Sequence, residues 1–462
     1  MKVSDVLDSR PTTRIQIFIV GLALLILILD GLDLQLLSFA APVILSEWNI
    51  TQAELGIALS AALVGMTIGT TAGGALGDRW GKRRITILSV ILFGIATIAA
   101  SARDNVPSMA ILRLISGLGF GAATPNVFAL VSEFLSQRAR PRAIGLMTIG
   151  SPVGGMAGSA LALLLIPSLG WRATFIICGI ATLILLVIFR AIVPESPGYL
   201  LRRGRNEDAL RSLERAVGEK FDGEAISLEA EQRGASNSPL REVLASRNKR
   251  VNVGCWLGFF AAQFVVFAFL GWFPVVLRGA GLSLESALRA SLAFNMISVV
   301  GSVLAGWVIN WIGTRRTILL AAASATIAIV LMPWTINATT GDGWEATWPL
   351  LVVASLAGAG VAMTITALYT VAAHAYTASH RATGMGISLS FGRLAGIITT
   401  LVGGVVLTLS DDTWVFFGLL AGVMVVAALS AAVINRHLQP QPLNAAAKTV
   451  ALVAADSGEP RR

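Results

Sequence analysis

The chain has 462 residues, of which 55% are apolar and only 13% charged, with a mean hydropathy of +0.75. Soluble domains carry about 25% charged residues, so this chain has too few charges to cover the surface of a water-soluble fold. The composition excludes a cytosolic enzyme, a disordered chain and a nucleic-acid-binding protein. It is typical of a polytopic helical membrane protein.

Apolar stretches long enough to cross a membrane recur along the whole chain. A helix needs about 20 residues to cross about 30 Å of hydrocarbon, and twelve such stretches occur, six on each side of a polar break. They cover approximately 15–41, 54–76, 85–102, 107–134, 143–166, 171–193, 250–277, 286–309, 317–337, 348–375, 382–408 and 413–435. We therefore expect an all-α integral membrane protein with twelve transmembrane helices in two six-helix bundles.

The polar break has the composition of a soluble segment. It carries Arg202, Glu207 and Arg211 at spacings that suit ion pairs along a helix. We expect an N-terminal bundle with a short tail over 1–193, a central loop over 194–249, a C-terminal bundle over 250–437 and a tail over 438–462. The loop and both tails are expected to be cytoplasmic.

Loop charges predict this orientation. With a net charge of +9, the chain places its cations mainly in the loops on one side of the predicted spans. The basic side carries Arg79, Lys82, Arg83, Arg84, Arg138, Arg140, Arg142, Arg315, Arg316 and Arg381, and the other side carries Glu47, Glu54, Asp104, Asp342, Glu345, Asp411 and Asp412 against Arg103, Arg172, Arg278 and Arg289. The positive-inside rule assigns the basic side, and with it both termini, to the cytoplasm.

An internal repeat supports two related bundles. The loop at 74–84, GALGDRWGKRR, is matched by GWVINWIGTRR at 306–316, which lies 232 residues later. Repeats in the same sense after an even number of spans imply two halves related by an axis along the membrane normal. The second copy has Asn310 and Trp311 where the first has Asp78 and Arg79, so a charged latch is expected to be weaker in the C-terminal half.

Residues for other chemistries are missing. Cys178 and Cys255 lie in apolar stretches, which indicates no disulfide framework. Gly81-Lys82 is followed by arginine, so no phosphate-binding loop for ATP is present. Three histidines form no cluster with metal-ligand spacing. We expect no enzyme activity, no metal and no cofactor.

Several motifs together resemble a known family. The loop at 74–84 is similar to the signature of the major facilitator superfamily, and Pro194-Glu195-Ser196-Pro197 is similar to an element that this superfamily often has after span six. Further matches are DGLD at 30–33, RLISGLGFG at 113–121 followed by Pro125-Asn126, RATG at 381–384, and Gly392-Arg393. Across spans one to eleven the chain resembles the aromatic acid/proton symporters, which import benzoate, hydroxybenzoate, protocatechuate and related acids.

Asp30 and Asp33 are the candidate proton-coupling residues. A charge in the middle of a membrane costs at least about 2.5–3.5 kcal/mol, so each one needs a partner or a purpose. Three residues apart on a helix, the two side chains lie on one face, and two carboxylates so close in a low-dielectric site resist simultaneous ionisation. The sequence does not distinguish which one carries the proton. The alternative is that they are paired and inert, or that one caps a broken helix.

Arg113 and Arg393 are candidates for carboxylate recognition. A guanidinium binds a carboxylate through two parallel hydrogen bonds, which an ammonium cannot match. We expect Arg393, near the middle of span eleven, to hold the substrate carboxylate and Arg113, in span four, to tune Asp30 or Asp33. The alternative is that each arginine is paired permanently with a protein carboxylate.

Other polar and aromatic residues could line the same site. Aromatic acids need a flat apolar slot with a few polar groups. Gln263, Asn295 and Tyr369 are candidate substrate-binding residues, and Phe267, Trp272 and His374 are weaker ones, since such side chains in membrane helices are more often core or interface residues.

A gating latch is expected at the cytoplasmic rim. The resemblance implies that Asp78, Arg79 and Arg83 contact the opposing bundle when that face closes. Glu133 is a candidate partner. The alternative is that these cations only fix the orientation of the loop.

The favoured function is import of a small aromatic carboxylate with protons by alternating access in a bacterial cytoplasmic (inner) membrane, with a monomer as the working unit. A drug/proton antiporter is the alternative, because GSPVGG at 150–155 is similar to a motif of such exporters. A transporter-like sensor is a third hypothesis, and neither tail contains a recognisable output domain. No nucleic-acid partner is expected.

Overall fold

The computed structural model describes residues 7–8, 10–218, 243–339, 344–376, 381–410 and 412–440. Within these ranges the regular structure is entirely helical, which confirms the expected all-α class. The middle of the expected central loop, the tail beyond residue 440, and the loop acids Asp342 and Asp411 lie outside the described residues.

The helices form two consecutive groups separated by a short polar pair. The first group contains α2 (Arg14–Trp48), α3 (Gln52–Trp80), α4 (Lys82–Ala100), α5 (Val106–Glu133), α6 (Arg140–Thr148) and α7 (Gly150–Ile192). The polar pair is α8 (Pro197–Arg202) and α9 (Asn206–Val217), and a short 3-10 turn, η1 (Ser246–Asn248), precedes the second group. That group contains α11 (Lys249–Gly279), α12 (Leu284–Ala338), α13 (Trp344–Ala375), α14 (Arg381–Leu409) and α15 (Thr413–Val433).

The described residues hold the twelve spans that hydropathy predicts. Ten helices are long and apolar enough to cross a membrane. Two of them, α7 and α12, are each interrupted by a glycine in the left-handed region, Gly170 with φ 78° and Gly313 with φ 81°. Each of these helices is therefore two spans joined by a tight turn, and the ten helices comprise twelve spans.

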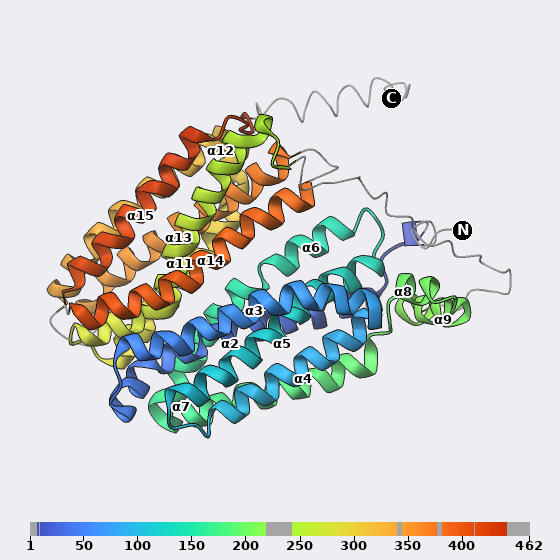
Figure 1. Cartoon of the computed structure of the whole chain (residues 1–462), viewed down its shortest axis with the longest axis horizontal. Helices are drawn as coiled ribbons and strands as arrows, with labels where there is room; N and C mark the ends of the chain where they lie inside the picture. The colour runs from blue at the N-terminus through green and yellow to red at the C-terminus, as the bar shows by residue number, and fades with distance from the viewer. Residues whose placement is uncertain are drawn as a thin grey trace, which may run out of the picture.

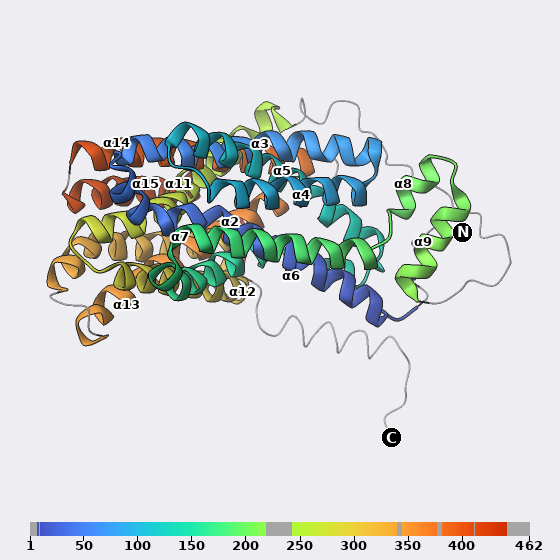
Figure 2. The same ribbon diagram turned by 90° about the horizontal axis from the view of Figure 1, so that it is seen from below.

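The two groups pack as separate bundles that lie side by side (Figure 1). We call the end of the molecule where α2 and α14 finish the Trp48 end, and the opposite end the α9 end. Figure 2 shows α8 and α9 beyond the ends of the long helices, lying across the α9 end. The helices of the two bundles approach each other at the Trp48 end and diverge toward the α9 end (Figure 1).

The sequence repeat corresponds to a repeated turn. Gly81, with φ 103°, separates α3 from α4, and Gly313 makes the matching turn inside α12. The two glycines are 232 residues apart, the spacing of the repeat. Since only glycine adopts this conformation without a steric cost, the repeat preserves the turn while the charged residues before it differ.

Hydrogen bonds between the bundles lie from the middle of the molecule to the Trp48 end. The Ala53 N–H donates to Thr408 Oγ1 at 3.0 Å, and Ser38 Oγ donates to the Gly271 carbonyl at 2.6 Å. At the α9 end, no hydrogen bond or ion pair joins the bundles within the part of the chain that the structure describes. We therefore call the molecule closed at the Trp48 end, where hydrogen bonds join the bundles, and open at the α9 end, where none does among the described residues.

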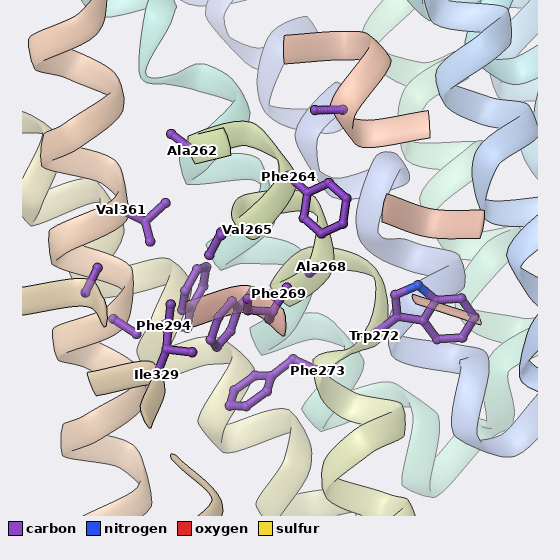
Figure 3. Packing of buried hydrophobic residues seen from close by; sticks show 14 of the residues in the cluster. Ala262, Phe264, Val265, Ala268, Phe269, Trp272, Phe273, Phe294, Ile329 and Val361 are labelled. Atoms are coloured by element: carbon purple, nitrogen blue, oxygen red, sulfur yellow. The ribbon is translucent and has the colours of Figure 1, made fainter. Parts of the chain in front are cut away.

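An aromatic core stabilises the C-terminal bundle (Figure 3). Phe269 on α11 stacks on Phe294 of α12 with ring centroids 4.6 Å apart, and Phe273 packs beside both. Trp272 lies on a different side of α11 (Figure 3), where its indole N–H donates to the Thr400 carbonyl at 3.2 Å and its ring contacts Gly56 of the other bundle. One helix thus supplies both the core of its own bundle and part of the closed interface.

Glycines bring α3 and α5 into backbone contact. A Cβ added at Gly65 would lie 2.1 Å from the Leu114 carbonyl oxygen, and one at Gly121 would lie 2.1 Å from that of Met66. Small residues allow such approach between membrane helices. The glycine run at 117–121 is therefore a helix-packing surface.

We predict that Gly121→Ala lowers the free energy of unfolding by about 1–3 kcal/mol, because the added methyl group must separate α3 from α5. The measurement is the thermal unfolding midpoint of the detergent-purified protein. Gly21→Ala is the matched control, since a Cβ at Gly21 meets nothing within 4 Å. An unchanged midpoint for Gly121→Ala would contradict the close packing.

Candidate functional site

A buried ion pair joins three helices of the N-terminal bundle. Arg113 Nη1 on α5 donates to Asp33 Oδ2 on α2 at 3.1 Å and to the Asp33 carbonyl at 3.2 Å. Thr97 Oγ1 on α4 donates to Asp33 Oδ1 at 2.7 Å. Arg113 is 1% exposed and Asp33 7%. Both carboxylate oxygens of Asp33 therefore have donors, and Arg113 pairs with Asp33 rather than with Asp30.

Arg113 has more donors than the pair uses. Its guanidinium carbon lies 4.9 Å from the centroid of the Phe175 ring on α7, in a cation–π contact. Its Nε and Nη2 atoms are buried and have no hydrogen-bond partner within the described residues. The guanidinium is thus fixed on one side and unsatisfied on the other.

Asp30 has a different environment one helical turn away. It is 5% exposed, and its Oδ1 atom is buried without a hydrogen-bond partner among the described residues. Around it α2 and α7 touch through their backbones: a Cβ at Gly31 would lie 2.0 Å from the Ser151 carbonyl oxygen, and one at Gly154 would lie 2.1 Å from that of Ile28. The glycine between the aspartates therefore serves close helix contact.

Arg393 on α14 has no carboxylate partner among the described residues. It is half-buried, and no ion pair or hydrogen bond to it occurs within the described ranges. Its electrostatic neighbour is Tyr369 on α13, whose ring packs edge-on against Phe259 of α11 with centroids 5.0 Å apart. Tyr369 is 36% exposed.

Gln263 and Phe267 lie close to the same stretch of α14. The Gln263 side chain packs against Gly392, and the Phe267 ring packs against Gly396. Both side chains are half-buried, and Gln263 makes no hydrogen bond within the residues described. Gln263, Tyr369 and Arg393 therefore lie near one another on α11, α13 and α14, and their role in binding a substrate stays a prediction.

Asn295 lies elsewhere and is engaged with the protein. Its side-chain nitrogen on α12 donates to Gln35 Oε1 and to Ser159 Oγ, both at 3.0 Å, and to the Ser291 carbonyl at 3.1 Å. Gln35 is on α2 and Ser159 on α7, so Asn295 joins the two bundles. Among the weaker candidates, Trp272 is fully buried and His374 is exposed at the α9 end.

The expected gating residues lie at the α9 end within their own half. Asp78 is 3.7 Å from Arg202, and both side chains are about half exposed. Arg83 donates from its side chain to the Arg190 carbonyl at 2.6 Å, and the Arg79 carbonyl accepts from Arg203 at 2.7 Å. The open α9 end of this conformation leaves contact with the opposing bundle as a prediction.

A neighbouring polar network includes residues that the sequence did not single out. Glu133 accepts hydrogen bonds from Lys82, from the Ser196 hydroxyl and from the Gly198 N–H. Glu195 accepts from the backbone N–H groups of Arg83 at 2.9 Å and Arg84 at 3.3 Å, and so caps the start of α4. The signal for Glu195 was present in the PESP motif. The sequence gives no comparable signal for Lys82 or Thr97, because a lysine in a loop and a threonine in a helix are common.

The C-terminal half closes its repeated turn in a different way. Leu438, beyond α15, exchanges two hydrogen bonds with Thr314: its carbonyl accepts from the Thr314 N–H at 3.1 Å, and its N–H donates to Thr314 Oγ1 at 3.0 Å. His437 adds a contact from Nδ1 to Thr314 Oγ1 at 3.2 Å, and burial lowers the pKa of His437. Here a neutral segment accepts the hydrogen bond of a backbone N–H after the turn, as the Glu195 carboxylate does in the first half.

Comparison with known proteins was consistent with this geometry. Residues 23–344 match the model of the Major Facilitator Superfamily. A gallate transporter of Pseudomonas putida is 31% identical over 437 residues, which cover 94% of this chain and 95% of that protein. A 4-hydroxybenzoate transporter, PcaK, of Pseudomonas aeruginosa is 29% identical over 436 residues, with the same shares covered.

Among solved structures, the fold is similar to a D-xylose-proton symporter. The TM-score is 0.69 at 18% sequence identity, and the match covers 90% of this chain and 97% of that chain. At this identity the likeness concerns the fold, and it supports the arrangement of twelve spans in two bundles.

Proposed function

The chain belongs to the Major Facilitator Superfamily and is a transporter rather than an enzyme, and we propose that it imports a small aromatic carboxylic acid together with a proton. The observation that carries this proposal is Arg393, a half-buried guanidinium without a carboxylate partner among the described residues. A cation within a membrane helix is costly, so an unpaired one indicates a missing anion. The substrates for which the similar transporters are named, gallate and 4-hydroxybenzoate, are aromatic acids.

The surroundings of Arg393 suit an aromatic ring with a polar substituent. Tyr369 offers aromatic surface, and Gln263 offers an amide whose donors and acceptor make no hydrogen bond among the described residues. In this proposal Arg393 binds the carboxylate through parallel hydrogen bonds while Tyr369 and Gln263 contact the ring and its substituents. A drug/proton antiporter has no comparable use for Arg393, and the 150–155 segment instead contributes to the α2–α7 contact.

Alternating access is supported by the distribution of contacts. The bundles meet at the Trp48 end and separate at the α9 end. Rocking of the bundles would exchange these contacts for new ones at the α9 end, where Asp78, Arg79 and Arg83 remain the proposed latch, with Arg113 acting through Asp33. Asn295 would act as an interbundle contact rather than as a substrate ligand. The proposed working unit is a monomer without a cofactor.

The proposed location is the bacterial cytoplasmic membrane, with the α9 end in the cytoplasm. Lys82, Arg83 and Arg84 lie at that end beside α8 and α9, whereas Glu47 and Asp104 pair with Arg172 at the Trp48 end. The excess of cations at the α9 end follows the positive-inside rule.

We predict that Arg393→Lys raises the concentration of 4-hydroxybenzoate needed for half-saturation about ten- to hundredfold. The reason is that loss of paired charge-assisted hydrogen bonds costs about 1.5–3 kcal/mol. The measurement is counterflow of radiolabelled acid in proteoliposomes, with protein-free vesicles subtracted. Arg289→Lys is the matched control, since Arg289 pairs with Glu285 at an exposed site. Equal half-saturation in Arg393→Lys and wild type would contradict the proposed role, and no counterflow of 4-hydroxybenzoate, gallate or benzoate by folded wild type would contradict the substrate class.

The orientation predicts which introduced thiols react from outside. Ala102→Cys at the Trp48 end should be labelled by an impermeant maleimide in right-side-out membrane vesicles, whereas Glu207→Cys on α9 should require permeabilisation. Both positions are exposed, and the native Cys178 and Cys255 are buried, at 5% and 0% exposure, so background labelling stays low. The opposite labelling pattern would invert the orientation.

A further inference from the structure

The two aspartates of α2 have unequal sets of partners. Asp33 accepts from Thr97 through one oxygen and from Arg113 through the other. Asp30 makes no ion pair or hydrogen bond within the described residues, and its Oδ1 atom is buried. Three residues along one helix separate a carboxylate with compensated charge from one without compensation.

These environments favour different protonation states. An ionised carboxylate that is buried without donors is strongly disfavoured, whereas a protonated carboxyl is neutral and loses far less on burial. Asp33 has both a hydroxyl donor and a guanidinium, so its ionised form is the compensated one. Asp30 lies beside this negative charge and has no cation of its own.

The charged and titratable groups around Asp30 and Asp33 determine the net charge of this region. Asp33 is the charged neighbour of Asp30, on the same helix. Arg113 from α5 and the Cys178 thiol from α7 lie near Asp33, and α4 contributes the neutral Thr97. The charges of Asp33 and Arg113 cancel, so ionisation of Asp30 would leave one uncompensated negative charge in this region of the bundle.

We propose that Asp30 carries the transported proton, while Asp33 remains ionised as the fixed counter-ion of Arg113. The inference rests on the proposed proton symport and assigns it to one carboxyl. In this conformation, which is open at the α9 end, Asp30 holds its proton.

Arg113 supplies a means of tolerating release of that proton. Its Nε and Nη2 atoms are buried donors without partners among the residues described. When the Asp30 O–H bond breaks and the proton leaves to water, these spare donors are the available compensation for the new carboxylate.

The test compares gradient-driven accumulation with exchange in proteoliposomes, using radiolabelled 4-hydroxybenzoate. Exchange needs no proton release, and asparagine imitates a protonated aspartate. We expect Asp30→Asn to keep a counterflow rate within about twofold of wild type. Its proton-driven accumulation, after the value for protein-free vesicles is subtracted, should be at least about tenfold lower than that of wild type. Asp33→Asn should lose both activities, because it leaves the buried Arg113 unpaired. Asp104→Asn, at an exposed ion pair, is the control and should keep both.

A second measurement reads the proton itself. The infrared carbonyl band of a protonated carboxyl, recorded at neutral pH in an ester-free detergent, should be present in wild type and absent in Asp30→Asn. Where Asp33→Asn fails to fold, the double variant Asp33→Asn/Arg113→Gln removes both charges together and should keep the band.

The outcomes separate this inference from the proposed function. Proton-driven accumulation by Asp30→Asn, or an infrared band that survives in Asp30→Asn, would overturn the assignment to Asp30. Wild-type transport that ignores the proton gradient would instead contradict the proposed symport, and it would be seen before any variant is compared.

Discussion

The buried ion pair between Asp33 and Arg113 constrains the rest of the N-terminal bundle. A guanidinium at 1% exposure in an apolar bundle requires a fixed negative charge, and removal of one partner from such a pair typically costs about 3–5 kcal/mol. The pair fixes α5 to α2, and Thr97 adds α4. Because Asp33 is used in this way, Asp30 is the carboxylate of the two that has no hydrogen-bond partner among the described residues.

The two bundles therefore carry different parts of the proposed chemistry. The N-terminal bundle holds the two carboxylates and their arginine, and the C-terminal bundle holds Arg393, with Tyr369 and Gln263 nearby. The contacts of Asn295 with Gln35 and Ser159 join the halves between these two sites. Gln35 lies two residues from Asp33 on α2, so movement at the interface and protonation at Asp30 involve the same helix.

The fold follows almost completely from hydropathy, whereas the site follows only in part. Length and apolar content predict twelve spans, and the repeat predicts the matching turns at Gly81 and Gly313. Helical spacing places Asp30 beside Asp33. It cannot show that Arg113 and Thr97 both donate hydrogen bonds to Asp33, because these bonds depend on how α2, α4 and α5 are rotated relative to one another. Likewise, an asparagine in an apolar helix gives no sign of whether it faces a substrate or, as for Asn295, a neighbouring bundle.

At the α9 end, too, the sequence predicts the elements but not the contacts between them. The PESP motif indicates an element after span six, but the capping of α4 by Glu195 and the pairing of Lys82 with Glu133 depend on tertiary contacts. In the second half the charges of the motif are replaced, and Leu438 with Thr314 closes the turn through neutral hydrogen bonds. Equivalent turns are thus held by a carboxylate in one half and by backbone groups in the other.

In the proposed mechanism a single carboxyl takes up one proton for each monovalent acid anion. The most direct measurement separates the two components of the proton gradient in proteoliposomes, with initial rates corrected for diffusion of the acid into protein-free vesicles. A membrane potential acts on net charge by about 2.3 kcal/mol per charge per 100 mV, and one proton with one anion carries none. The account predicts accumulation with a pH gradient alone and none with a potential alone. Accumulation with a potential alone would show that more than one proton moves with each anion and would contradict it.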